Sequence, residues 1–193
     1  MTSELQQALD PVVEAMHDLG IEYRVGGSVA SSRYGVARST LDVDVVADIR
    51  VEHVERLTAA LGGAYYVDAE SMREAIRRRR SFNVIHLKSM IKVDVFVLKE
   101  RAFDQVAFSR PRREPLGDDD PRPYDLTAPG DLVLLKLEWY RAGDGVSQRQ
   151  WQDILGVLRM QRGRLDLDDM RRWAVDLEVG DLLERAIEES AED

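Results

Sequence analysis

The sequence lacks cysteine and long apolar segments. None of its 193 residues is cysteine, so no disulfide framework holds the fold. No apolar run approaches the roughly 18 residues that span a bilayer, and the first residues contain no apolar signal segment. The three histidines, His17, His53 and His86, are scattered without the spacing of metal ligands. These absences predict a cytoplasmic protein that does not enter a membrane.

Basic residues are outnumbered by acidic ones. The 27 Lys and Arg residues face 36 Asp and Glu residues, which gives a net charge of −9 at pH 7. Nucleic-acid binding requires clustered cations that neutralise phosphates, so this balance argues against a protein that holds nucleic acid over its whole surface. The run from Arg77 to Arg80 is a local exception. It is typical of a solvated helix end, and an RNA-binding rim is the alternative.

The hydrophobic residues, 44% of the chain, are enough for a core and have two periodicities. Spacings of three and four residues predict helices over 5–19, 51–61 and 69–80, with a helical turn over 29–34. Runs rich in β-branched residues predict strands over 23–25, 41–49 and 65–67 and a hairpin of 82–87 with 91–98. This order predicts an α/β (α+β) fold in which helices flank a mixed sheet.

Five of the six prolines lie between Pro111 and Pro129, an interval that also holds the acidic run from Asp118 to Asp120. Because proline interrupts regular structure, we predict an α/β domain over 1–110, a Pro-rich linker over 111–123 and a helical C-terminal domain over 124–193. Helices are expected at 131–141, 150–160, 168–176 and 180–189, forming a bundle. The three tryptophans, Trp139, Trp151 and Trp173, occupy helical positions that favour a place in the core.

Two carboxylates stand one residue apart in the predicted strand 41–49. Asp42 and Asp44 project from the same face of that strand, while the valines between and after them enter the core. Asp94 takes the corresponding polar face of the strand 91–98. If the two strands are neighbours, three carboxylates converge and require a positive charge between them. Mg²⁺, or Mn²⁺, suits this position because it binds carboxylates together with substrate phosphates.

A glycine pair and a serine precede these acids. Gly26 and Gly27 allow the backbone to approach a ligand closely, and Ser28 adds a hydroxyl beside the amides of a helix start. The pair matches neither the Walker nor the dinucleotide-binding pattern. Such a turn can hold a triphosphate whose oxygens are bridged by metal ions.

The combination of these motifs resembles a known superfamily. Gly27-Ser28, followed after thirteen residues by Asp42-Val43-Asp44 and later by Asp94, resembles the nucleotidyltransferases related to DNA polymerase β. The resemblance implies that the three aspartates bind the catalytic metal ions and that Asp94 also helps to activate the acceptor hydroxyl. It implies that Gly26, Gly27 and Ser28 hold the phosphates of the nucleotide.

A second resemblance, to a small bacterial branch, extends into the C-terminal part. This branch includes toxin nucleotidyltransferases of abortive-infection, type IV toxin–antitoxin systems, and the matching segments are 38–44, 128–136 and 152–154. It implies that Lys136 and Asp153 line the active site, and we group them with Arg38 as nucleotide-binding residues. A position on an apolar helix face, with the charge reaching solvent, explains Lys136 equally well. A cognate antitoxin would be a partner.

These motifs lead to one functional hypothesis and one alternative. The hypothesis is a Mg²⁺-dependent nucleotidyltransferase that moves a nucleoside monophosphate from an NTP such as ATP to an acceptor hydroxyl and releases pyrophosphate. A tRNA end, a protein hydroxyl and a small molecule remain open as acceptors. The alternative is a non-catalytic nucleotide- or partner-binding module on the same fold. Three clustered aspartates argue against it, because a binding module does not need so costly a cluster.

Overall fold

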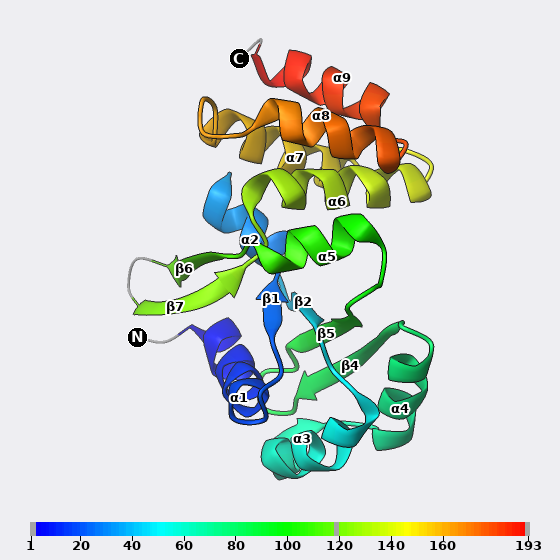
Figure 1. Cartoon of the computed structure of the whole chain (residues 1–193). Coiled ribbons are helices and arrows are strands. Elements are labelled where there is room, and N and C mark those ends of the chain that lie inside the picture. Colours follow the sequence, from blue (N-terminus) through cyan, green and yellow to red (C-terminus); the bar gives the residue numbers. More distant parts are fainter. Residues whose placement is uncertain (1–2, 118–119, 192–193) are drawn as a thin grey trace.

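The computed structural model describes residues 3–117 and 120–191. Within these residues, seven strands form one sheet in the order β3-β4-β5-β2-β1-β7-β6, and helices pack on it (Figure 1). Its strands are β1 (Tyr23–Val25), β2 (Asp42–Ala47), β3 (Tyr65–Tyr66), β4 (Ser81–His86), β5 (Lys92–Val97), β6 (Arg112–Gly117) and β7 (Asp120–Leu126). Strand β5 lies parallel to β2 and antiparallel to β4, so the sheet is mixed. The predicted α/β class is confirmed.

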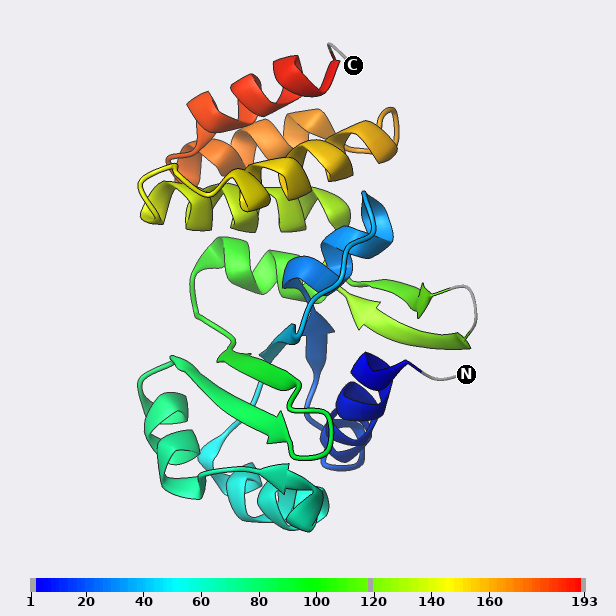
Figure 2. The same cartoon turned by 180° about the vertical axis from the view of Figure 1, so that it is seen from behind.

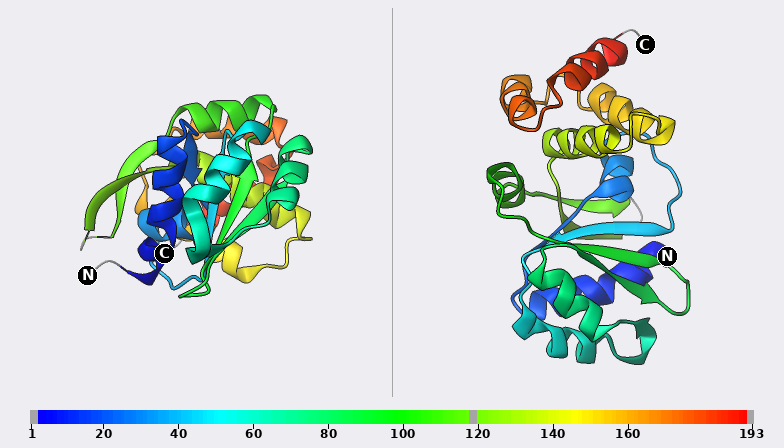
Figure 3. Two further views of the ribbon diagram at one scale, coloured as in Figure 1. Left: turned by 90° about the horizontal axis from the view of Figure 1, so that it is seen from below. Right: turned by 90° about the vertical axis from the view of Figure 1, so that its right-hand side faces the viewer.

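Three helices cover one face of this sheet: α1 (Glu4–Asp18), α3 (Val54–Leu61) and α4 (Ala69–Arg77). Seen from below in Figure 3, they lie together over that face. Helix α1 begins at a capping box in which Ser3 and Gln6 satisfy each other's backbone amides. Its residues Leu9, Val12 and Met16 recur at helical spacing and are fully buried, which attaches the helix to the core.

The other face is covered by α2 (Gly27–Tyr34), α5 (Ala102–Ser109) and a bundle of four C-terminal helices, shown from behind in Figure 2. The bundle helices are α6 (Pro129–Ala142), α7 (Gln148–Met160), α8 (Leu167–Asp176) and α9 (Gly180–Ala191), close to the predicted ranges. A Cβ added to Gly35 would lie 2.8 Å from the backbone of Gly156, so the end of α2 touches α7 directly. This contact brings the bundle close to the sheet.

The predicted linker over 111–123 coincides instead with the hairpin of β6 and β7. Strand β6 is an edge strand, and Pro115 pairs with Pro123 in a hairpin whose outer part extends beyond the short strand β1. Prolines are tolerated there because an edge does not require every amide to donate. Strand β7 reaches the sheet interior only at Leu126, which pairs with Val25. Asp118 and Asp119 lie outside the described residues, and the division into two domains stays a prediction.

Helix α5 was not expected from the spacing of its residues, although Phe103 and Ala107 are buried on one face of it. Within the described residues, no helix combines the length and the apolar character needed to cross a membrane.

Candidate functional site

The predicted acidic cluster lies where β2 and β5 run side by side. In this parallel pair Asp42 stands opposite Lys92 and Asp44 opposite Asp94, on strands roughly 4.8 Å apart. The residues that alternate with them, such as Val43 and Val93, are fully buried on the opposite face. Burial raises the pKa of Asp44 above its ordinary value, and the neighbouring charge of Asp94 raises that pKa further. A negative charge on Asp44 therefore needs a cation nearby.

Lys92 supplies a positive charge to two of the three carboxylates, those of Asp42 and Asp94. Its Nζ atom lies 2.8 Å from Asp94 Oδ2 and 3.6 Å from Asp42 Oδ1. Within residues 3–117 and 120–191, no three His, Asp or Glu side chains are grouped closely enough to hold a metal ion. The geometry gives a reason, because Asp42 and Asp94 are directed to the same ammonium group. Paired carboxylates that share their ion with substrate phosphates still form a donor set that suits Mg²⁺.

Lys92→Gln is expected to increase the affinity for Mn²⁺ or Mg²⁺ several-fold, because an entering divalent cation would no longer compete with the lysine for Asp42 and Asp94. The affinity can be measured as metal-dependent protection against thermal unfolding. Lys88→Gln, which removes an equal charge from the turn between β4 and β5, serves as the control. Unchanged or weaker metal binding by Lys92→Gln would show that Lys92 does not compete for the site.

The glycine turn lies directly against Asp44. The backbone amide of Gly26 donates to the carbonyl of Asp44 at 2.8 Å, and α2 begins at the next residue. Gly27 has a φ of +54°, and a Cβ built on it would lie 1.6 Å from Asp44 Oδ2. A residue with a side chain cannot occupy this position without moving the carboxylate. The first turn of α2 has no side-chain cap, so no capping side chain accepts from its amides, and Gly26, Gly27 and Ser28 line the cavity.

Two cations surround one acid in this cavity: Lys136 of α6 and Arg38 of the loop between α2 and β2 both bind Asp153 of α7. Asp153 accepts hydrogen bonds from Lys136 at 2.9 Å and from Arg38 at 3.0 and 3.1 Å. Arg38 also donates to the hydroxyl of Ser28, which connects this cluster to the glycine turn. Burial raises the pKa of Asp153, but the bonds from Arg38 and Lys136 outweigh it and hold the pKa below the ordinary value. Two cations on one carboxylate leave an excess positive charge, which suits a phosphate.

All nine predicted site residues line one cavity of about 630 Å³ between the sheet and the helices α2, α5, α6 and α7. They come from four separate parts of the chain: Gly26, Gly27, Ser28, Arg38, Asp42, Asp44, Asp94, Lys136 and Asp153. The cavity thus has carboxylates on its floor and uncapped amides and cations beside them. Their roles in binding or catalysis stay predictions.

Sequence reasoning missed the aromatic part of this cavity. Trp139 lines it, is 56% exposed and meets Phe96 edge-on with ring centroids 6.3 Å apart. The prediction that Trp139 belongs to the core is therefore wrong, whereas Trp151 is buried as expected. The signal was its spacing, because Trp139 follows Lys136 by three residues and so shares its helix face. Spacing also indicated Lys92, because residues two apart in a strand share a face and Lys92 precedes Asp94 by two residues.

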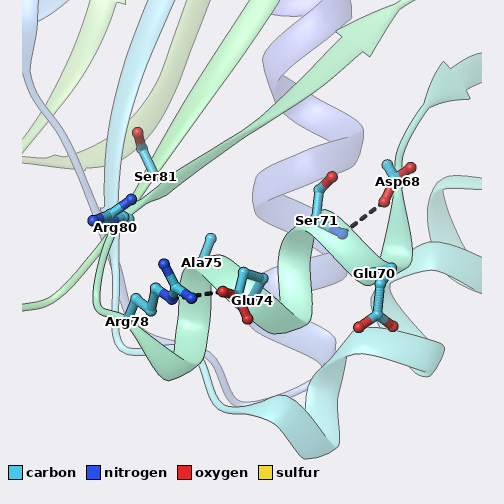
Figure 4. Close-up of a pocket in the computed structure, with 8 residues that line it drawn as sticks. All are labelled: Asp68, Glu70, Ser71, Glu74, Ala75, Arg78, Arg80 and Ser81. Carbon is cyan, nitrogen blue, oxygen red and sulfur yellow. Dashed lines mark hydrogen bonds and ion pairs between the residues drawn. The ribbon is translucent and has the colours of Figure 1, made fainter.

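A second hollow, of about 620 Å³, lies at helix α4 (Figure 4) and tests the alternative of an RNA-binding rim at Arg77–Arg80. Its lining contains charges of both signs, with Asp68, Glu70 and Glu74 beside Arg78 and Arg80. Arg78 pairs with Glu74, and Arg79 with Glu100, at 2.5 Å each. Such paired side chains are typical of a solvated helix end and make a poor surface for phosphates.

No model of a known protein family matches the sequence, and no curated protein matches it. Solved structures do share its fold. One is a solution structure of the antibiotic-resistance factor ANT(2'')-Ia, which has substrate-regulated conformation dynamics. It is 15% identical, with 96% of this chain and 98% of that chain covered and a TM-score of 0.55. Another is a crystal structure of ANT(2'')-Ia in complex with adenylyl-2''-tobramycin. It is 13% identical, covers 91% and 98% of the two chains and has a TM-score of 0.57.

Both neighbours are structures of an aminoglycoside nucleotidyltransferase. Neither represents the abortive-infection toxins, so that finer resemblance stays a prediction. Identities of 13–15% carry the fold and leave the activity to be argued from the site. The chain has a nucleotidyltransferase-like fold.

Proposed function

We propose that this protein transfers a nucleoside monophosphate from an NTP to a hydroxyl group of a small molecule and releases pyrophosphate. The observation that carries the proposal is the convergence of the nine site residues, from four parts of the chain, on one cavity. Three of them are strand carboxylates. The start of α2, which has no side-chain cap, lines the same cavity, as do Lys136 of α6 and Arg38 of the loop between α2 and β2.

The proposed reaction is an in-line displacement at the α-phosphorus of the NTP. The acceptor oxygen forms a new bond to this phosphorus, the bond to the oxygen bridging the α- and β-phosphates breaks, and pyrophosphate leaves with that electron pair. Asp94 accepts the proton of the acceptor hydroxyl. The amides of Gly27 and Ser28 and the ammonium group of Lys136 hold the phosphates, while Asp153 positions Lys136 and Arg38.

Asp42, Asp44 and Asp94 are the residues that would hold Mg²⁺. A divalent cation at such carboxylates neutralises charge on the transferred phosphoryl group and lowers the pKa of an oxygen bound to it. The raised pKa of Asp44 fits this role, because a carboxylate that is disfavoured when alone gains most from a nearby cation. In this proposal the three aspartates hold the metal ion, and Lys136 and Arg38 hold the phosphates.

A small-molecule acceptor is favoured by the shape and charge of the protein. The proposed reacting groups lie in a cavity lined by the sheet and the helices α2, α5, α6 and α7. The chain carries a net charge of −9, which disfavours RNA. Arg78 and Arg79, which follow α4, are paired with Glu74 and Glu100, and this pairing disfavours RNA binding there. The neighbour ANT(2'')-Ia was captured with an adenylylated small molecule, adenylyl-2''-tobramycin. We extend only the chemical class of acceptor to this chain.

The test is transfer of label from each of the four α-³²P-labelled NTPs in the presence of Mg²⁺. The acceptors are total RNA, total protein and the low-molecular-weight fraction of a cell extract, with a panel of amino sugars alongside. We expect label in a small molecule with the wild type and none with Asp42→Ala/Asp44→Ala. Label in RNA or protein would contradict the proposed acceptor class. Nucleotide binding without any transfer would instead favour the non-catalytic binding module.

A further inference from the structure

The cavity extends past the acids into a second, apolar part. Its lining there consists of Val46 and Phe96 from the sheet, Ala107 from α5, and Leu132, Leu135 and Trp139 from α6; we refer to these six residues as the apolar lobe. Val46 and Phe96 follow Asp44 and Asp94 by two residues on the same sheet face, so the lobe continues the floor that carries the acids. A ligand held at the acids can therefore reach into the lobe.

The lobe combines flat aromatic surfaces with aliphatic side chains. Trp139 remains 56% exposed although it packs edge-on against Phe96, so part of its indole is open to a ligand. The two carboxylates near this end, Asp104 and Glu138, are both bonded to Arg101. An unpartnered amine gains little from acids that are already engaged, whereas an uncharged planar ring gains apolar contact and stacking.

The position of the lobe relative to the cations fits the dimensions of a nucleotide. Trp139 lies three residues beyond Lys136 on α6, an axial rise of about 4.5 Å along the same helix face. A triphosphate bound at Lys136, Arg38 and the glycine turn would thus place the rest of the nucleotide within reach of the indole. Of its remaining groups, the base is the one with apolar faces.

We propose that the apolar lobe binds the nucleobase of the NTP and that Trp139 stacks on it. This proposal rests on the proposed function, because it assigns a place to one part of its substrate. It gives the exposed tryptophan a role in affinity for the nucleotide. The part of the cavity lined by Thr40 and the exposed Asp42 is left for the acceptor.

The test compares binding of each NTP with binding of inorganic tripolyphosphate, which has the phosphates and no base. Calorimetric titrations with Mg²⁺ present would use the wild type, Trp139→Ala and Trp139→Phe. The wild type should bind at least one NTP about tenfold or more tightly than tripolyphosphate, as expected when one base stacks on an aromatic side chain. Trp139→Ala should remove most of this difference and leave tripolyphosphate affinity within about twofold, while Trp139→Phe should keep most of it.

The other outcomes distinguish an error in the stacking on Trp139, in the apolar lobe and in the proposed function. If Trp139→Ala binds every NTP as the wild type does, or loses affinity for tripolyphosphate to the same extent, the base does not stack on Trp139. Equal affinity of the wild type for tripolyphosphate and all four NTPs would overturn the lobe and leave the proposed function intact. Failure of the wild type to bind either ligand would overturn the proposed function itself.

Discussion

Asp44→Asn is expected to lower the rate of nucleotidyl transfer at least about 100-fold, the scale seen when one group that stabilises transition-state charge is lost. The amide keeps the shape of the carboxylate but removes the charge that would hold a divalent cation between β2 and β5. Initial rates of label transfer measure the effect. The rise in melting temperature that Mg²⁺ plus NTP gives the wild type should also disappear, because ligand binding and folding are linked.

The same substitution should stabilise the protein without metal. The pKa of Asp44 is raised in the folded state, so ionisation of this group opposes folding. Stability of the wild type is therefore lost as the pH rises through the unfolded value of about 3.9 and on through the higher folded pKa. Asp44→Asn avoids this loss, and its advantage in free energy of unfolding should grow over that range and then stay constant.

Asp48→Asn is the matched control. Asp48 follows β2 by one residue and is exposed, and it does not line the cavity. It should change neither the transfer rate nor the response to Mg²⁺ plus NTP. Should Asp44→Asn retain near-wild-type transfer while binding NTP normally, the assignment of Asp44 to a metal ion is wrong. Lower stability of the metal-free variant at neutral pH would contradict the electrostatic account of Asp44.

Local sequence patterns predicted the helices and strands of this fold better than the way in which the strands pair. The spacing of Leu9, Val12 and Met16 is a property of one helix, and the alternation around Asp42 and Asp44 is a property of one strand, so both are visible in the sequence. The prolines near Pro115 were misleading because proline has one meaning in a linker and another at a sheet edge. Strand pairing distinguishes the two, here the pairing of β6 with β7 and of β7 with the distant β1, and residue type alone does not give it.

The candidate site shows the same limit. Asp44 and Asp94 were brought together by assuming that their strands are neighbours, and the parallel pairing of β2 with β5 meets that condition. The bond from Lys136 to Asp153 connects different helices. The sequence placed these two residues at the active site only through a resemblance and did not predict the bond. Lys92 acts through a rotamer that points at two carboxylates. Side-chain direction of this kind depends on packing and cannot be read from residue order.

Gly27→Ala is expected to abolish most nucleotidyl transfer, although it adds only one methyl group. Its Cβ would lie 1.6 Å from Asp44 Oδ2, so the carboxylate must move or the start of α2 must shift. Either movement separates the amides proposed to bind phosphate from the acids, and positioning errors of about 1 Å cost roughly 100-fold in rate. The φ of +54° adds strain of about 1–2 kcal/mol for alanine, which lowers the free energy of unfolding.

Gly20→Ala separates these two effects. Gly20 has a φ of +70°, and an added Cβ there meets no atom within 4 Å, so this variant carries backbone strain without a clash. Its free energy of unfolding should fall by about 1–2 kcal/mol with transfer unchanged. Gly27→Ala should lose more stability than Gly20→Ala, together with most transfer and the thermal response to Mg²⁺ plus NTP. Equal stability losses in the two variants, with transfer intact in both, would mean that close contact between the glycine turn and Asp44 is not required. The contact matters because it fixes the separation between the groups proposed to hold the phosphates and the acid proposed to hold the metal ion.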